Sequence, residues 1–129
     1  MNVNTRLLQL IGRRTGLLAV LWLLAPAASA DCAADAYGEV YCGGGRCKRD
    51  HNGTIWCSRT YQGGAQRSRE GRVLCGTGQC VKNIRGEIYC SSVVGGAVLK
   101  DSKGLVRCQG RCERATAAQC ENTRADSAG

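Results

Sequence analysis

The chain has 129 residues, among them ten Cys, 18 Gly and a single His, and its formal net charge is +8. All ten cysteines lie after residue 31, so about one residue in ten of the last 99 is Cys. This density argues against a large enzyme, a transmembrane protein and a long helical array, and is typical of an exported scaffold held by disulfides.

Residues 1–30 have the layout of a secretory signal peptide. Three arginines precede an unbroken apolar run over residues 17–25, and Ala28-Ser29-Ala30 supplies the small residues of a cleavage site. The apolar run is far shorter than the roughly 20 residues that span a bilayer. We therefore expect cleavage after Ala30 and a periplasmic or secreted product, whether by the general or, through Arg13-Arg14, the twin-arginine route.

An internal repeat follows the leader. Residues 71–91 restate the Cys, Gly and apolar positions of residues 38–58, and a shorter third copy starts at Gly104. Within this 33-residue period, a unit Gly-x-(Val/Ile)-x-Cys occurs five times. Its alternation is typical of a short strand, and its Gly suits the last place of a three-residue hairpin loop. The sequence thus predicts one all-β domain over residues 31–121, a meander of five hairpins with about ten short strands.

The hairpin register predicts disulfides. A loop at residues 84–86 places Cys80 opposite Cys90, and the same arithmetic pairs Cys47 with Cys57 and Cys32 with Cys42. An alternative framework crosses the Gly-rich turns and joins Cys42 to Cys47, Cys75 to Cys80, and Cys108 to Cys112. We favour the first framework because it accounts for Cys32. It leaves Cys75, Cys108, Cys112 and Cys120 to join the units.

The C-terminal region has the one helix-like segment of the predicted domain, residues 113–119. We expect a short helix there, which Cys120 fastens to the sheet through Cys75 or Cys108. Residues 122–129 are expected to form a flexible polar tail.

The sequence predicts no catalytic residues, no cofactor and no metal site. His51 lies in Asp-His-Asn-Gly, a run of ordinary turn formers, whereas a catalytic base must be held rigidly beside a nucleophile. The Cys spacings approach those of structural zinc sites, but the export signal favours disulfides. Gly-rich turns at residues 43–45 and 76–78 lack the Lys-Ser/Thr of a phosphate-binding loop.

Charge supplies the candidate binding site. Residues 46–72 have a net charge of +5, while the remainder of residues 31–129 sums to zero. The basic residues of this stretch are Arg46, Lys48, Arg49, Arg59, Arg67, Arg69 and Arg72. We interpret them as a surface for an anionic partner, either an envelope glycolipid or an acidic polysaccharide, with nucleic acid the weaker fit. The alternative is a solvated face that keeps a thin scaffold soluble.

Two equivalent connecting loops, residues 58–64 and 91–96, follow Cys57 and Cys90. Loops on a rigid scaffold commonly carry recognition. The first loop is basic and aromatic. In the second, Val93 and Val94 are expected to turn inward.

The segments GTGQCVKNIRGEIYCS and GGAVLKDSKGLVRCQGRC resemble small exported Cys/Gly-rich repeat proteins of proteobacteria, of uncharacterised activity. The resemblance covers about residues 38–120 and implies an exported scaffold, with no site to carry over. We expect a non-catalytic binding or structural module of the cell envelope. The alternative is a secreted cationic inhibitor or toxin-like effector that inserts a hairpin tip into a protein target.

Overall fold

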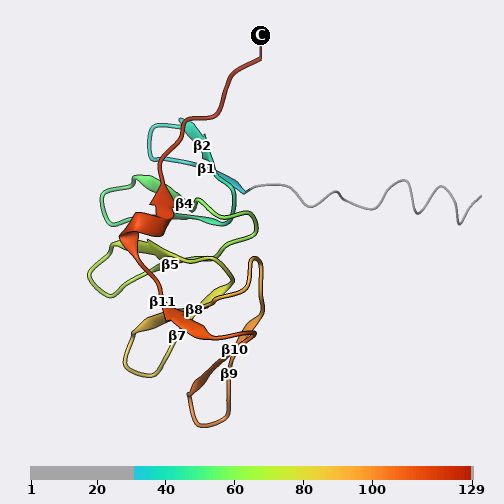
Figure 1. Cartoon of the computed structure of the whole chain (residues 1–129). Coiled ribbons are helices and arrows are strands. Elements are labelled where there is room, and N and C mark those ends of the chain that lie inside the picture. The colour runs from blue at the N-terminus through green and yellow to red at the C-terminus, as the bar shows by residue number, and fades with distance from the viewer. Residues whose placement is uncertain (1–30, 129) are drawn as a thin grey trace, which may run out of the picture.

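The computed structural model describes residues 31–128, which form five β-hairpins stacked along one axis (Figure 1). In chain order, hairpins 1 to 5 pair β1 (Cys32–Ala34) with β2 (Val40–Cys42), β3 (Cys47–Arg49) with β4 (Ile55–Ser58), β5 (Ala65–Arg67) with β6 (Val73–Cys75), β7 (Cys80–Lys82) with β8 (Ile88–Ser91), and β9 (Val98–Lys100) with β10 (Val106–Cys108). The predicted meander is confirmed. The predicted leader, residues 1–30, lies outside the described residues. Among the described residues, no helix is long and apolar enough to cross a membrane.

The residue that directly precedes each three-residue loop, here called the loop-opening residue, accepts hydrogen bonds from backbone N–H groups further along the loop. In hairpin 2, Asp50 Oδ1 accepts hydrogen bonds from the backbone N–H groups of Asn52 and Thr54, at 2.8 and 2.9 Å. Asn83 and Asp101 do the same in hairpins 4 and 5. The third loop residue is always Gly, and its φ lies between 79° and 85° in all five hairpins. A side chain would strain this left-handed conformation, which explains the repeated Gly.

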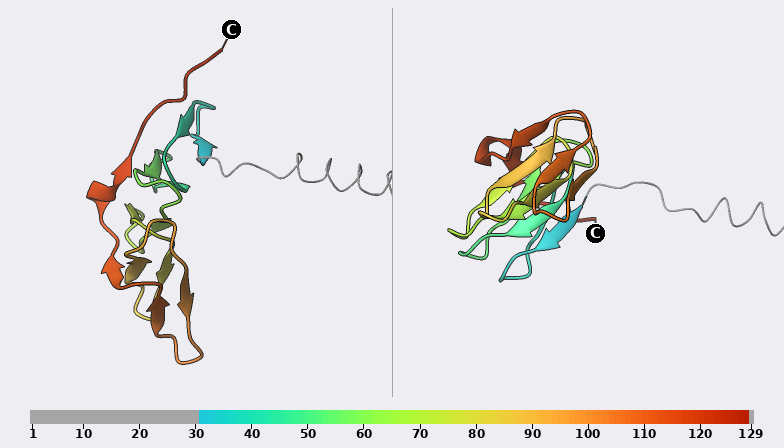
Figure 2. Two further views of the ribbon diagram at one scale, coloured as in Figure 1. Left: turned by 45° about the vertical axis from the view of Figure 1, so that its right-hand side comes forward. Right: turned by 90° about the horizontal axis from the view of Figure 1, so that it is seen from below.

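The hairpins pack face to face, with the strands of successive hairpins fanned about the stack axis (Figure 2). We call the face turned toward the next hairpin along the chain the lower face, and the opposite one the upper face. In hairpin 2 the lower face carries the cross-strand pair Lys48 and Trp56, and Trp56 packs on Ala65, Val73 and Cys75 of hairpin 3. Leu74 of hairpin 3 packs in the same way on hairpin 4. Alternation of side chains along each strand therefore builds the same kind of junction at both places.

The core is small and is built mostly from cystines and single branched residues. Ile55, Val73 and Ile88 are buried, one in each of the three middle hairpins. The connecting loops approach this core through glycines. Gly76, for example, lies so close to the side chains of Cys80 and Cys90 that a Cβ atom would overlap them. The disulfides and glycines together allow a tight stack with few large apolar side chains.

The C-terminal segment, residues 112–125, runs back along the stack as a strap. It contains β11 (Cys112–Arg114), one 3-10 turn (Ala117–Gln119) and β12 (Cys120–Glu121). β11 pairs with β8 and β12 pairs with β4, while single bridges join Thr116 to Cys75 and Arg124 to Tyr41. The strap thus pairs with the second strands of hairpins 4, 3, 2 and 1 in turn (Figure 1).

The strap corrects the helix expected over residues 113–119. Only residues 117–119 are helical, and residues 113 and 114 belong to β11. The open edges of β8 and β4 offer backbone partners that satisfy an extended segment. Part of the expected tail is also bonded, because Cys42 N–H donates to Thr123 O at 3.0 Å and Ala125 N–H donates to Val40 O at 2.9 Å.

All ten cysteines form disulfides. The three hairpin bridges Cys32–Cys42, Cys47–Cys57 and Cys80–Cys90 confirm the favoured framework, and Cys75–Cys120 confirms one of the two expected links to Cys120. The fifth bridge, Cys108–Cys112, comes from the alternative framework. Five disulfides in so short a chain indicate an oxidising environment.

Candidate functional site

The first strands of the five hairpins lie along one edge of the stack, opposite the strap. Among residues 31–128, each first strand pairs only with its own hairpin mate, whereas β4 and β8 also pair with the strap. Consecutive first strands contact one another, from β1 to β9. Side chains at one register position of these strands therefore form a column that runs the length of the described domain.

One such column is basic. The third residues of the first strands are Ala34, Arg49, Arg67, Lys82 and Lys100, and each is paired with the Val or Ile of the repeat in the second strand. Arg49, Arg67 and Lys100 are exposed and Lys82 is half-buried. The Arg49 guanidinium donates from Nη2 to Ala34 O at 2.8 Å, and so reaches across to the same register position of hairpin 1.

Two further basic residues lie beside this column. Arg46 directly precedes β3, and Arg46 and Lys48 line a shallow pocket of about 200 Å³ together with Gln66 and Gln79. Arg46 Nε donates to Gln79 Oε1 at 3.3 Å. We define the basic edge as these two residues and the column: Arg46, Lys48, Arg49, Arg67, Lys82 and Lys100.

The structure divides the seven basic residues expected to act together. Arg46, Lys48, Arg49 and Arg67 lie on the basic edge. Arg59 lies against the strap, where its Nε donates to Ala118 O and Cys120 O, both at 3.1 Å. Arg69 lies at the hairpin tips over Gly86, and Arg72 lines a pocket beside the strap.

Summation of charge over a stretch of chain missed Lys82 and Lys100, which belong to the later repeat. A signal for them exists in the hairpin register. In hairpins 2 to 5 a basic residue directly precedes the residue that opens the loop, giving Arg-Asp, Arg-Ser, Lys-Asn and Lys-Asp. The position directly before the loop-opening residue therefore identifies the members of the column, whereas a sum of charge over a continuous stretch of sequence does not.

The acidic groups are paired elsewhere. In the described residues, the four ion pairs use Arg107, Arg111, Arg114 and Arg124, which belong to hairpin 5 and the C-terminal segment after it. The shortest joins Arg114 Nη1 to Glu87 Oε2 at 2.7 Å. A hydrogen bond from Asn83 and the charge of Arg114 lower the pKa of Glu87. No ion pair of the described residues involves the basic edge, so its charge faces solvent without a fixed counter-ion.

Two clefts on the other side of the stack are related by the internal repeat. One, of about 390 Å³, lies between hairpins 2 and 3 and is lined by Asp50, His51, Trp56 and Val73. The other, of about 420 Å³, lies between hairpins 4 and 5, where Asn83, Ile84, Tyr89 and Val106 occupy the positions 33 residues later. The repeat therefore builds the same cleft twice, each time beside an aromatic side chain.

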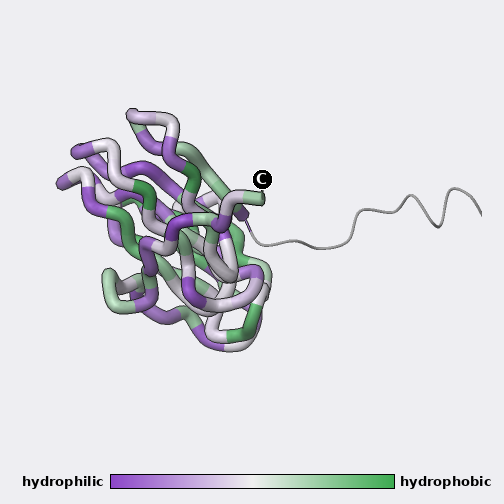
Figure 3. Tube along the Cα trace, turned by 90° about the horizontal axis from the view of Figure 1, so that it is seen from above, coloured by the Kyte–Doolittle hydropathy of each residue, from purple (hydrophilic) through white to green (hydrophobic). Residues whose placement is uncertain are grey.

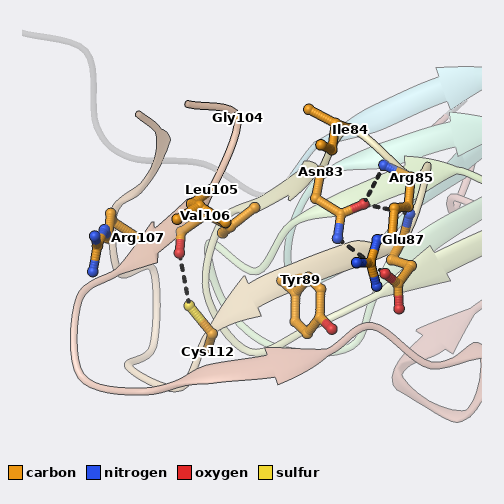
Figure 4. A pocket seen from close by; sticks show the side chains of 10 residues that line it. All are labelled: Asn83, Ile84, Arg85, Glu87, Tyr89, Gly104, Leu105, Val106, Arg107 and Cys112. Atoms are coloured by element: carbon orange, nitrogen blue, oxygen red, sulfur yellow. Dashed lines mark hydrogen bonds between the residues drawn. The ribbon is translucent and has the colours of Figure 1, made fainter. Parts of the chain in front are cut away.

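The two clefts differ in chemistry. In the first, burial raises the pKa of Asp50, but hydrogen bonds from Trp56, Thr54 and Asn52 outweigh it and hold the pKa below its ordinary value. The second cleft is more apolar, and Figure 4 shows Ile84 and Leu105 across its opening from one another. Their side chains are 67% and 53% exposed. Arg114 lies over the Tyr89 ring at 5.3 Å from its centroid.

The connecting loops depart from expectation at one point. Val93 and Val94 were expected to turn inward, yet they are 39% and 56% exposed. Gly96, which follows them, packs directly on Ser91 Oγ and on Val93, so a glycine and not the valine pair makes the inward contact of this loop. Hydrophilic residues dominate several of the hairpin tips (Figure 3).

Comparison with known proteins adds no relative. No protein-family model, no curated protein and no solved structure matches the chain significantly.

Proposed function

We propose that this protein is a non-catalytic binding module, active in the periplasm or outside the cell, that holds an anionic polymer along its basic edge. One observation carries the proposal. Four of five hairpins place a basic residue at the same register position, and none of the four has an ion-pair partner among the described residues. A purely solubilising charge does not require a fixed register.

The spacing of the column suits a polymer with regularly repeated charge. Consecutive first strands approach within 8 Å, Cα to Cα, and face-packed sheets ordinarily lie about 10 Å apart, so successive column residues are expected at intervals of about 8–10 Å. An acidic polysaccharide or an array of phosphorylated glycolipid headgroups also carries regularly repeated negative charge. Phosphates along one DNA strand are about 3.4 Å apart along the axis, so the column would meet only about every third one. The basic edge also lacks aromatic side chains on which bases could stack.

The first test is retention on a heparin-like resin. Protein purified from cells that express the full chain is compared with an edge variant, in which Arg49, Arg67, Lys82 and Lys100 are all replaced by Gln. A matched control replaces four basic residues away from the edge, Arg69, Arg72, Arg85 and Lys103, and so removes the same charge. We expect the parent and the control to elute well above physiological salt, and the edge variant to elute far earlier.

The salt dependence of the affinity for the resin provides a second, quantitative readout of this test. Loss of four contacts should reduce the slope of log affinity against log salt by about 3, since each contact contributes about 0.7–0.9. Equal losses in the edge variant and the control would show that net charge alone governs retention, and would refute the basic edge. So would elution of the parent protein at low salt.

A second function is favoured by the apolar cleft. Ile84 lies at the tip of hairpin 4, 67% exposed, beside Leu105. Exposed aliphatic side chains of this size, in a chain with so few of them, suit an inhibitor or effector that contacts a protein target. Binding of one protein that is insensitive to salt and is abolished by Ile84→Ser would support this function over polymer binding.

A further inference from the structure

The junctions between hairpins 2 and 3 and between hairpins 3 and 4 have the same arrangement. The lower face presents the middle residues of the two strands, and the upper face of the next hairpin receives them with its Val or Ile and its strand-end residues, a cystine in hairpins 2 and 4. The hairpin tips also stack in this direction, because His51, Arg69 and Ile84 each lie over the loop Gly of the following hairpin. The stack therefore has a direction, with unlike faces at its two ends.

At each end of the stack, one of the two faces that form such a junction lies exposed, without a neighbouring hairpin. Hairpin 1 exposes its upper face, where Val40 is 43% exposed, while the equivalent Ile55, Val73 and Ile88 are 1%, 5% and 2% exposed. Gly38 has no atom within 4 Å of the place of its Cβ, unlike the loop glycines of hairpins 2 to 5.

Hairpin 5 exposes the opposite half. Leu99 and Arg107 form the cross-strand pair of its lower face, and Leu99 is 73% exposed. Repeat proteins ordinarily end on a polar outer face. Here one end offers Leu99, and the other offers Val40 beside the Cys32–Cys42 bridge.

The charges of the two end hairpins are complementary. Hairpin 1, residues 32–42, contains Asp35 and Glu39 and no basic residue, a formal charge of −2. Hairpin 5, residues 98–108, contains Lys100, Lys103 and Arg107 against Asp101, a formal charge of +2. Glu39 is paired with Arg124 of the strap at 3.5 Å, and Arg107 with Asp101 at 3.4 Å, which leaves Asp35 at one end and Lys100 and Lys103 at the other. A second copy is therefore attracted end to end, and two hairpin 5 ends repel each other.

The strap also leaves the second strand of one hairpin without a second pairing partner in residues 31–128. It pairs with the second strands of hairpins 1 to 4, but within the described part of the chain β10 of hairpin 5 pairs with β9 alone. Beyond Arg124 the chain runs past hairpin 1 (Figure 1). That is the place where β10 of a copy stacked on hairpin 1 would lie with its second edge open.

We propose that the protein associates head to tail with further copies of itself, hairpin 5 of one copy stacking on hairpin 1 of the next. The contact is heterologous and does not close on itself, so it generates open chains of molecules. One hairpin face is smaller than the roughly 800 Å² per partner of a standard interface. Association is accordingly expected at about 0.1–1 mM protein, near the weak end of specific contacts.

Sedimentation velocity over a concentration series provides the test. Protein from the expressed full chain should show a weight-average sedimentation coefficient that rises with concentration without a plateau at the value of the dimer. Val40→Asp removes the hairpin 1 end, Leu99→Asp removes the hairpin 5 end, and Val94→Asp, at an exposed loop valine, is the control. We expect the first two variants to stay monomeric and the control to behave as the parent.

Mixing the two end variants distinguishes head-to-tail contact from every symmetric one. Each variant keeps one intact end, so an equimolar mixture should form a dimer and no larger species. A parent protein that remains monomeric at 1 mM, the upper limit of the expected range, overturns the proposal. A plateau at the dimer, association that survives in either end variant alone, or a mixture that stays monomeric also overturns it. Because polymer binding uses the basic edge, its failure would leave this result unaffected.

Discussion

The side chain of His51 lies directly over Gly71, so that a Cβ atom added at Gly71 would stand 2.6 Å from the Cβ of His51. The same residue donates its backbone N–H to Gly71 O at 2.9 Å. Gly71 thus meets two demands at once, a positive φ of 85° and the close approach of the hairpin above it.

These two demands can be separated by substitution. Gly38→Ala introduces only the conformational strain, about 1–2 kcal/mol, because the space beside it is open. Gly71→Ala adds overpacking against His51, which costs about 1–3 kcal/mol more. Denaturant unfolding of both variants measures the difference. Equal losses of stability would show that the His51 contact yields freely and that the stack tolerates side chains between its tips.

The two non-hairpin disulfides should contribute unequally to stability. Cys75–Cys120 closes a separation of 45 residues and Cys108–Cys112 one of four. The loop-entropy relation gives about 4 kcal/mol for the first and about 2 kcal/mol for the second. Replacement of each pair by Ala, followed by thermal unfolding, should reproduce this order. Amide exchange over residues 112–125 should rise in the Cys75/Cys120 variant and stay low over the hairpins.

A buried hydroxyl provides a third prediction. Ser58 is fully buried, and its Oγ donates to Gly76 O at 2.8 Å. Ser58→Ala leaves that carbonyl without its side-chain donor, so we expect a loss of about 1–3 kcal/mol in the free energy of unfolding. Ser127→Ala, near the C-terminus, should change it by less than about 0.5 kcal/mol. A neutral result at Ser58 would mean that Gly76 O finds another donor.

Stability should fall in acid. Hydrogen bonds and neighbouring arginines lower the pKa values of Glu87 and Asp101. The pKa of Asp50 is also lowered, because its hydrogen bonds outweigh the effect of its burial. A carboxyl whose folded pKa is depressed stabilises the protein above its unfolded pKa, near 4, and this contribution is lost as the pH falls through the folded pKa. The melting temperature should therefore be lower at pH 3 than at pH 6.

Asp50→Asn tests the share of one carboxyl in this effect. Asn83 opens the loop of hairpin 4 with the same two backbone hydrogen bonds, so Asn at position 50 should keep the turn. The variant should lose less stability than the parent between pH 6 and pH 3. An unchanged pH dependence would assign the acid sensitivity to the other carboxyls.

The hairpins and three disulfides could be predicted because they are local. The loop Gly, the alternating strand and the ten-residue Cys spacing lie within a few residues of one another, and hairpin geometry converts them into a register. Cys80 opposite Cys90 follows from that arithmetic and is confirmed. The strap could not be found this way, because residues 113–119 have helical propensity and their strand partners lie in distant hairpins.

The candidate site was predicted in part for a related reason. A charge window groups residues that are neighbours in the chain, and it gathered Arg59 and Arg72 with Arg49. The stack instead groups residues of equal register, so Arg59 lies against the strap and Lys82 joins the column. The stacking of the repeats brings Arg49, Arg67, Lys82 and Lys100 to one edge. In the sequence, these four residues are recognised only by their position directly before the loop-opening residues.

The strap also has a consequence for the order of folding. Each hairpin closes over about ten residues, but the bridge between Tyr41 and Arg124 spans most of the described chain. Local contacts form fast and distant ones slowly, so the hairpins are expected to fold first and the strap to dock last. A ribosome or export channel that still holds residues 112–125 keeps the second strands uncovered. Docking of the strap on the second strands is thus expected to be the last step in forming the described domain.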